Sequence, residues 1–159
     1  MHFLTIVGAK YLIYVLLLIA GIFFLQMDRP VKYQMARFAL FSLPVTFAVA
    51  KLGSYFFYDP RPFVSGHFIP LIAHAADNGF PSDHALLAFA VAALVFHIEK
   101  KFGTVLYVLA LAIGVSRVAA GVHSFIDIFG SFVICVVVAV AVSLGEKALV
   151  KMPRDETSR

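Results

Sequence analysis

The chain has 159 residues, of which 62% are hydrophobic and 14% are charged. An ordinary soluble domain has about 25% charged and about 45–50% apolar residues, so this composition excludes a soluble globular protein and indicates an integral membrane protein. We expect one membrane-embedded domain over residues 1–150 and a polar cytoplasmic tail at 151–159. The net charge of +4 is attributed to membrane topology, and no nucleic-acid partner is expected. The single cysteine, Cys135, lies in an apolar run and is interpreted as a packing residue.

The first half of the chain contains two apolar runs that are long enough to cross a membrane. Residues 3–27 are interrupted only by Lys10, and no small-residue cleavage site follows them, so we expect a retained helix rather than a signal peptide. Residues 33–58 form the second run. Pro44 is expected to kink this helix, and Lys51 lies in its far half.

Residues 59–82 differ in kind from their surroundings. The run Asp59-Pro60-Arg61-Pro62 cannot continue a helix, and Asn78-Gly79 indicates a turn. Between them, residues 68–76 are apolar but too short to span a bilayer. We therefore expect a short interfacial or re-entrant segment within this loop.

Three further helices are predicted, at residues 83–98, 102–120 and 124–150. Ser82 is a favourable N-cap for the first of them, and Asp83 suits its first turn. The expected fold is all-α: a polytopic membrane bundle of about five transmembrane helices plus the short segment in the 59–82 loop.

The basic residues are distributed unevenly over the predicted topology. Nine of the 13 fall on the side of the 27–37 link, the 99–101 link and the C-terminal end: Arg29, Lys32, Arg37, Lys100, Lys101, Lys147, Lys151, Arg154 and Arg159. The positive-inside rule assigns that side to the cytoplasm. It places the 59–82 loop and the 117–124 turn on the outer face.

An arginine, a histidine and a carboxylate stand close together in the apolar run from Ser116 to Asp127. His123 and Asp127 are four residues apart, which places them one helical turn apart on one face. Such a carboxylate can fix the tautomer of the imidazole, and this leaves the other ring nitrogen free to attack. Arg117 carries a permanent charge in a fork that suits phosphate oxygens. The stretch indicates phosphate chemistry at a membrane surface.

These residues resemble the type 2 phosphatidic acid phosphatases, a family of metal-independent membrane phosphatases. The family pattern is Lys-x6-Arg-Pro, then Pro-Ser-Gly-His, then Ser-Arg-x5-His-x3-Asp. The third part is matched in full, and the first two are represented in the same order on the same predicted face. The matching residues are Arg61-Pro62, Pro81, Ser82 and His84, and then Ser116, Arg117, His123 and Asp127.

The chain departs from the family pattern at two positions. Asp83 stands where glycine is usual, and with the preceding residues 74–80 this variant looks like the bacterial undecaprenyl-diphosphatase branch. Ser54 stands where the first part has lysine. Lys51 lies three residues earlier, about 4.5 Å along a helix, and its long stem can extend toward the site.

The resemblance implies a role for each candidate residue. His123 is the expected nucleophile, Asp127 orients it, and His84 is the general acid and base. Phosphate oxygens are expected to bind Arg61, Ser82, Arg117, Lys51 and the backbone of Asp83. No metal and no cofactor are expected. The implied substrate is undecaprenyl diphosphate, hydrolysed through a phosphohistidine on the outer face of a bacterial cytoplasmic membrane.

Each of these residues also has a structural interpretation, and the function has alternatives. Arg117 can snorkel to the interface, His123 and Asp127 can be a helix-stabilising pair, and Ser82 and Asp83 can simply cap a helix. Another lipid phosphatase of the family, acting on phosphatidylglycerophosphate, phosphatidate or lipid A phosphate, is one alternative function. A small lipid or anion transporter is another. The oligomeric state stays open.

Overall fold

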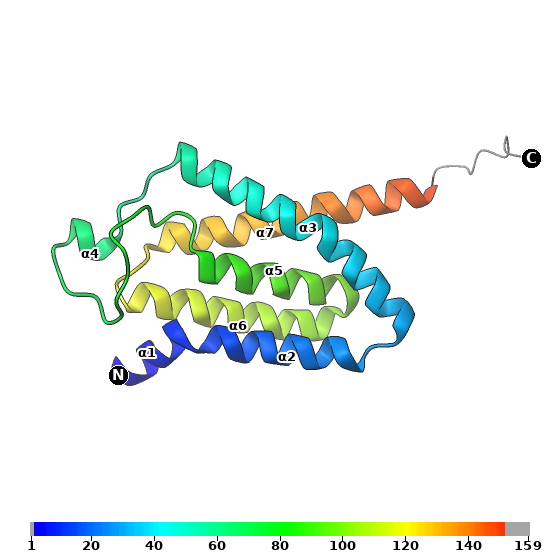
Figure 1. Ribbon diagram of the computed structural model, residues 1–159, viewed down its shortest axis with the longest axis horizontal. Coiled ribbons are helices and arrows are strands. Elements are labelled where there is room, and N and C mark those ends of the chain that lie inside the picture. Colours follow the sequence, from blue (N-terminus) through cyan, green and yellow to red (C-terminus); the bar gives the residue numbers. More distant parts are fainter. Residues whose placement is uncertain (1, 152–159) are drawn as a thin grey trace, which may run out of the picture.

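The computed structural model describes residues 2–151, and in this part of the chain all regular structure is helical (Figure 1). The all-α prediction is therefore confirmed. The helices are α1 (His2–Lys10), α2 (Leu12–Gln26), α3 (Arg29–Phe56), α4 (Pro62–Ser65), α5 (Asp83–Ile98), α6 (Lys100–Ala119) and α7 (Phe125–Lys151). Residues 152–159 of the predicted tail lie outside the described residues.

Helix α5 is the centre of the bundle, and it packs against α6, α7, α3 and α2 (Figure 1). Nine of its 16 residues are buried, most of them alanine or another aliphatic residue. At 16 residues it is about 24 Å long, which is shorter than the roughly 30 Å hydrocarbon core of a bilayer. This length is tolerated because the surrounding helices, rather than lipid, cover most of its surface.

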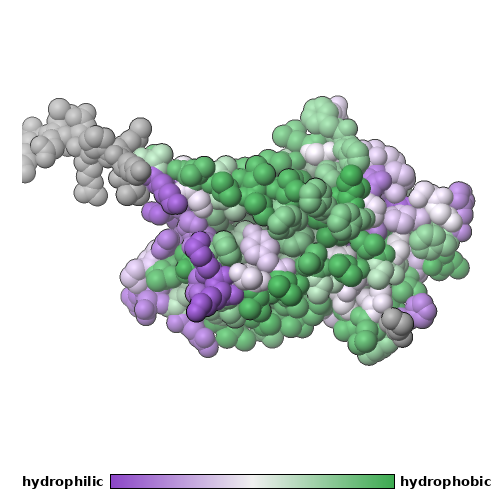
Figure 2. All heavy atoms as spheres, turned by 180° about the vertical axis from the view of Figure 1, so that it is seen from behind, coloured by the Kyte–Doolittle hydropathy of each residue, from purple (hydrophilic) through white to green (hydrophobic). Residues whose placement is uncertain are grey.

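The prediction of a polytopic membrane bundle is confirmed. By length and composition, α3, α6 and α7 can each cross a membrane, and the bent pair α1 and α2 can form a fourth span. Helix α5 is the shorter apolar helix that completes the five predicted elements. On the face shown in Figure 2, hydrophobic side chains dominate the middle, and hydrophilic ones gather toward the two ends.

The prediction of one continuous helix over residues 3–27 is wrong. The helix is interrupted at Tyr11, and α1 and α2 are bent by 46° relative to each other. Arg117 of α6 donates from Nη1 to the backbone oxygen of Ala9 at 3.3 Å, so this side chain takes a carbonyl from the end of α1. Side chains that bond to a helix backbone in this way are a known cause of kinks. This hydrogen bond therefore connects the N-terminal helix to a candidate site residue.

The segment between α3 and α5 closes one end of the bundle. Residues 68–76, expected to be interfacial or re-entrant, form no helix, and the only helical turn here is α4. Leu71 donates its N–H to the oxygen of Ala120 at 3.0 Å. Ile72 is buried in a small apolar cluster with Val122. The loop is thus packed against the link between α6 and α7, where the candidate residues lie.

Candidate active site

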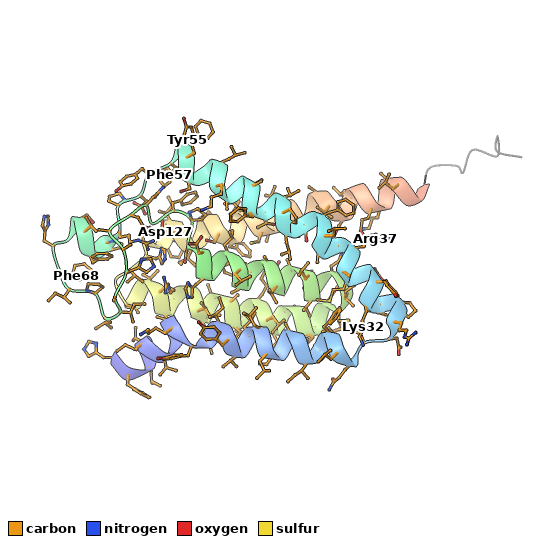
Figure 3. The ribbon with its side chains drawn as sticks, in the orientation of Figure 1. Lys32, Arg37, Tyr55, Phe57, Phe68 and Asp127 are labelled. Carbon is orange, nitrogen blue, oxygen red and sulfur yellow. The ribbon has the colours of Figure 1, made fainter. Side chains whose placement is uncertain are left out.

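Five of the predicted site residues are buried together at the loop end of the bundle, where Figure 3 labels Asp127. Their exposed fractions are 4% or less. They are Arg61, Ser82, Arg117, His123 and Asp127. Burying charge in a membrane protein is expensive, and such residues are usually functional. The structure brings together residues that are up to 66 positions apart, taking Arg61 and Asp127 as the extremes.

His123 and Asp127 form the centre of the cluster. Nδ1 of His123 lies 3.1 Å from Oδ2 of Asp127, and the same oxygen accepts the backbone N–H of Ser124 at 2.8 Å. Because Asp127 is held in two ways, its position relative to the ring is well defined. The carboxylate selects the tautomer with the proton on Nδ1. The lone pair is then on Nε2.

Two guanidinium groups converge on Nε2 of His123. Nη1 of Arg61 lies 3.2 Å from it, and Nη2 of Arg117 lies 3.3 Å from it. Two cations on one neutral nitrogen form an arrangement suited to an anion, since each guanidinium presents several N–H groups to oxygen. A phosphoryl group bound by both guanidinium groups would lie next to the ring nitrogen.

Arg61 is oriented by three further contacts. Its Nε donates to Oδ1 of Asp77 at 2.7 Å, and its Nη1 donates to the oxygen of Val122 at 2.8 Å. Its Nη2 reaches the oxygen of Asn78 at 3.4 Å. The hydrogen bond from Arg61 lowers the pKa of the Asp77 carboxyl below its ordinary value. This carboxylate is therefore charged over the physiological range, as expected for a side chain that is 60% exposed.

The backbone between Arg117 and His123 turns sharply. Gly121 has a φ of +78°, a conformation that side chains rarely adopt, and the ring of Phe68 packs directly over it. The turn allows Arg117, at the end of α6, and His123, just before α7, to face each other. The break between the two helices predicted at 102–120 and 124–150 is thus part of the site's geometry.

Ser82 and His84 come from the start of α5. Ser82 is at the N-cap position as predicted, but its hydroxyl makes no capping hydrogen bond, and its Oγ has no partner among the described residues. The prediction that this side chain caps the helix is therefore wrong. The hydroxyl is thus buried with its hydrogen-bonding capacity unused. His84 is half-buried in the first turn, where Arg117 and His123 are its electrostatic neighbours.

Lys51 and Asp83 lie beside this cluster. Both are exposed, and they line a pocket of about 180 Å³ between α3 and α5 that also borders Arg61. Nζ of Lys51 lies 5.3 Å from the centre of the Phe47 ring. The structure therefore places Lys51 on the approach to Arg61.

The pKa of His123 is lowered from its ordinary value. Burial is the largest cause, and the positive charges of Arg117 and Arg61 lower it further. The hydrogen bond to Asp127 opposes these effects. The ring therefore remains neutral, with a free lone pair, to lower pH than an ordinary histidine.

Three loop residues that the sequence interpretation did not select belong to this cluster: His74, Asp77 and Asn78. The ring of His74 lies 5.8 Å from that of His123, centre to centre. Asn78 accepts the N–H of Asp59 and donates to the oxygens of Ser54 and Phe57. In the sequence, Asn78-Gly79 indicated a turn, but it did not indicate that the Asn78 side chain would bond to this loop and to the end of α3.

Gly79 lies against the carboxylate of Asp127, and Asp59 contacts the neighbouring Ser124. A Cβ on Gly79 would lie 2.8 Å from Oδ2 of Asp127, so only glycine fits there without displacement. Asp59 accepts a short hydrogen bond from the hydroxyl of Ser124.

Among residues 2–151, no three His, Cys, Asp or Glu side chains are grouped so that they could hold a metal ion.

Comparison with known proteins shows which family the chain belongs to. Residues 11–150 match the model of the PAP2 superfamily. Undecaprenyl-diphosphatase BcrC of Bacillus subtilis (strain 168) is 38% identical over 82 residues, which are 52% of this chain and 42% of that protein. The Bacitracin transport permease protein BcrC of Bacillus licheniformis is 34% identical over 122 residues, 76% of this chain and 59% of that protein.

A third relative is YbjG of Escherichia coli (strain K12), provisionally named an undecaprenyl-diphosphatase. It is 36% identical over 129 residues, which are 80% of this chain and 64% of that protein. The chain thus spans between 42% and 64% of the length of these curated relatives. No solved structure matches it. The family model covers most of the described bundle, including every candidate residue, and the chain therefore belongs to the PAP2 superfamily.

Proposed function

We propose that this protein is a membrane lipid phosphatase that hydrolyses undecaprenyl diphosphate, or a related polyprenyl diphosphate, to the monophosphate. The observation that carries the proposal is the environment of His123. One ring nitrogen faces the carboxylate of Asp127 at 3.1 Å, and the other faces two guanidinium groups at 3.2 and 3.3 Å. A nucleophile, its orienting acid and an anion clamp are then in mutual contact.

In the first half of the proposed reaction, the lone pair on Nε2 of His123 attacks the terminal phosphorus. The bond from phosphorus to the bridging oxygen breaks, and that oxygen takes a proton from His84 as the lipid monophosphate leaves. Arg61, Arg117 and the hydroxyl of Ser82 stabilise the charge on the three equatorial oxygens. Asp127 stabilises the positive charge that develops on the ring.

In the second half, a water molecule attacks the phosphohistidine and gives its proton to His84. The nitrogen–phosphorus bond breaks, its electron pair returns to Nε2, and inorganic phosphate leaves. The positive charge that faces the phosphate comes from arginine, and the reaction as proposed needs no metal ion. EDTA is accordingly expected to leave the rate unchanged, and vanadate, which imitates pentacoordinate phosphorus, is expected to inhibit.

The substrate proposal is supported by two relatives whose names give undecaprenyl-diphosphatase activity. The test is a panel of detergent-solubilised substrates without added metal, run on the wild type and on His123→Ala. Undecaprenyl diphosphate should release phosphate fastest in the wild type, and the variant should release none. Faster hydrolysis of phosphatidylglycerophosphate, phosphatidate or lipid A phosphate would reassign the substrate. No hydrolysis of any of them would favour a transporter.

We also propose that the site faces the outside of a bacterial cytoplasmic membrane. This orientation is supported by Lys32 and Arg37, which lie at the end of the bundle opposite Asp127 (Figure 3), because basic residues favour the cytoplasmic side. Single cysteines in a Cys135→Ala background provide the test. One at Ile69, which is 93% exposed in the loop, should react with an impermeant maleimide on intact cells. One at Lys101 should not, and the reverse pattern would invert the topology.

A further inference from the structure

A long apolar groove lies between α6 and α7, with α5 as its floor, and its volume is about 920 Å³. Both outer helices pack along α5, but they contact each other only sparsely. They approach each other closely at Gly114, where a Cβ would overlap the side chain of Ile128. The groove is therefore a consequence of how α6 and α7 pack around α5.

The walls of the groove suit a hydrocarbon chain. Phe132 makes edge contacts with Phe89 at 5.3 Å and with Tyr107 at 6.2 Å between ring centres. Tyr107 also contacts Phe96 at 5.8 Å. All four side chains line the groove. A volume close to the upper end of ordinary ligand pockets, roughly 300–1,000 Å³, is large enough for an acyl chain.

The end of the groove away from the candidate active site is basic. Lys100 and Lys147 line it there, together with His97 and Ser143. Glu146 does not neutralise the lysines, since it pairs with Arg37 at 3.0 Å and with His97 at 3.3 Å. Among the described residues neither lysine pairs with a carboxylate. Figure 2 shows hydrophilic side chains gathered at one end of the molecule.

The groove is separate from the candidate active site. None of the buried site residues lines it. Arg117 lies on the side of α6 that faces α1, where it bonds to Ala9. Thr104 and Tyr107, by contrast, face the groove. A ligand whose charged group sits at the lysines is thus distinct from one whose phosphate sits at His123.

We propose that this groove binds one acyl chain of an anionic phospholipid from the leaflet at the Lys100–Lys147 end, with the two lysines holding its phosphate. Charge complementarity selects the anionic headgroup, and each lysine is expected to contribute roughly a fivefold preference over a zwitterionic one. The proposal does not rest on the catalytic function proposed above.

The test uses the absence of tryptophan from the chain. Phe132→Trp places a single fluorophore in the groove. The protein is reconstituted in vesicles of equal parts phosphatidylglycerol and phosphatidylcholine, with bromine on the acyl chains of one lipid or the other. Brominated phosphatidylglycerol should quench the fluorescence more strongly. The double variant Lys100→Gln/Lys147→Gln should remove the difference, whereas Lys32→Gln/Lys101→Gln, at the same end but outside the groove, should retain it.

Two further variants separate the groove from the general lipid surface. Ala139→Phe fills the groove and should reduce quenching by both lipids, whereas Ala141→Phe, on the exposed surface of the same helix, should not. Equal quenching by both lipids in the parent variant would overturn the proposal. So would weak quenching by both, which would indicate that a second copy of the chain covers the groove. Native mass spectrometry of the wild type should show retained phosphatidylglycerol that the Lys100→Gln/Lys147→Gln protein loses.

Discussion

Replacing Asp127 by asparagine is the most informative single change in the proposed active site. The carboxylate is fully buried, and its Oδ2 faces both Nδ1 of His123 and the N–H of Ser124. Asparagine has the same size but no charge, and either its amide oxygen or its amide nitrogen must take the place of Oδ2. The oxygen there accepts from both groups but no longer stabilises a positive charge on the ring. The nitrogen there loses the bond from Ser124 and donates to Nδ1, and the ring proton then moves to Nε2, so that the nitrogen between the two arginines loses its lone pair.

The magnitude follows from the lost contact. A hydrogen bond to a charged group contributes about 1.5–3 kcal/mol, which corresponds to about 10- to 150-fold in rate. The wrong tautomer adds to this, and in the serine-protease triad the equivalent change lowers kcat by about 10⁴. We therefore expect kcat for Asp127→Asn to fall by at least tenfold and by up to about 10⁴, with the fold retained.

The assay is release of inorganic phosphate from undecaprenyl diphosphate in detergent, with thermal unfolding measured on the same samples. Asp77→Asn is the matched control, because it removes a carboxylate that contacts Arg61 rather than His123 and whose side chain is 60% exposed. Its effect should be a few-fold at most, because the Asp77 side chain is largely exposed and asparagine can still accept from Nε of Arg61. Equal losses in the two variants, or normal kcat in Asp127→Asn, would refute the assignment of Asp127 as the orienting acid.

Three further predictions concern groups around this centre. Because burial and two arginines lower the His123 pKa from 6.5, the acid limb of kcat/KM should lie below pH 6.5; a limb above it would contradict the neutral ring. Gly79→Ala should lower kcat at least tenfold, since its Cβ meets the Asp127 carboxylate at 2.8 Å, whereas Gly145→Ala, in open space, should change nothing. Lys51→Ala should raise KM more than it lowers kcat, and an unchanged KM would mean that Lys51 does not help to bind the phosphate.

The helical architecture was predictable because bilayer thickness and apolar run length leave few alternatives. The break at Tyr11 was not, since nothing in residues 3–27 other than Lys10 marks it. At the bend, the backbone oxygen of Ala9 accepts a hydrogen bond from Arg117, which is more than 100 residues away. A local sequence pattern does not indicate such a long-range contact.

In the candidate site, too, contacts within one helical turn were predictable and contacts made by the loop were not. The spacing of His123 and Asp127 on one helical turn predicted a contact, and the structure has it at 3.1 Å. The roles of Asp77 and Asn78 were missed, because both lie in an irregular loop whose path depends on tertiary packing. The unused hydroxyl of Ser82 was missed for a related reason, since an N-cap position normally implies a capping bond.

The central claim is that Nε2 of His123 becomes bonded to phosphorus during turnover. The most direct measurement is mass spectrometry of protein quenched under alkaline conditions after mixing with undecaprenyl diphosphate. The His84→Ala variant should hydrolyse the intermediate slowly, because it lacks the proposed base. It also lacks the proposed acid for the first step, so a diphosphate with a good leaving group is used as its substrate. We predict a phosphorylated peptide with the modification on His123, and no such peptide in His123→Ala. Phosphate release by His123→Ala at the wild-type rate, or a modification on another residue, would contradict the account.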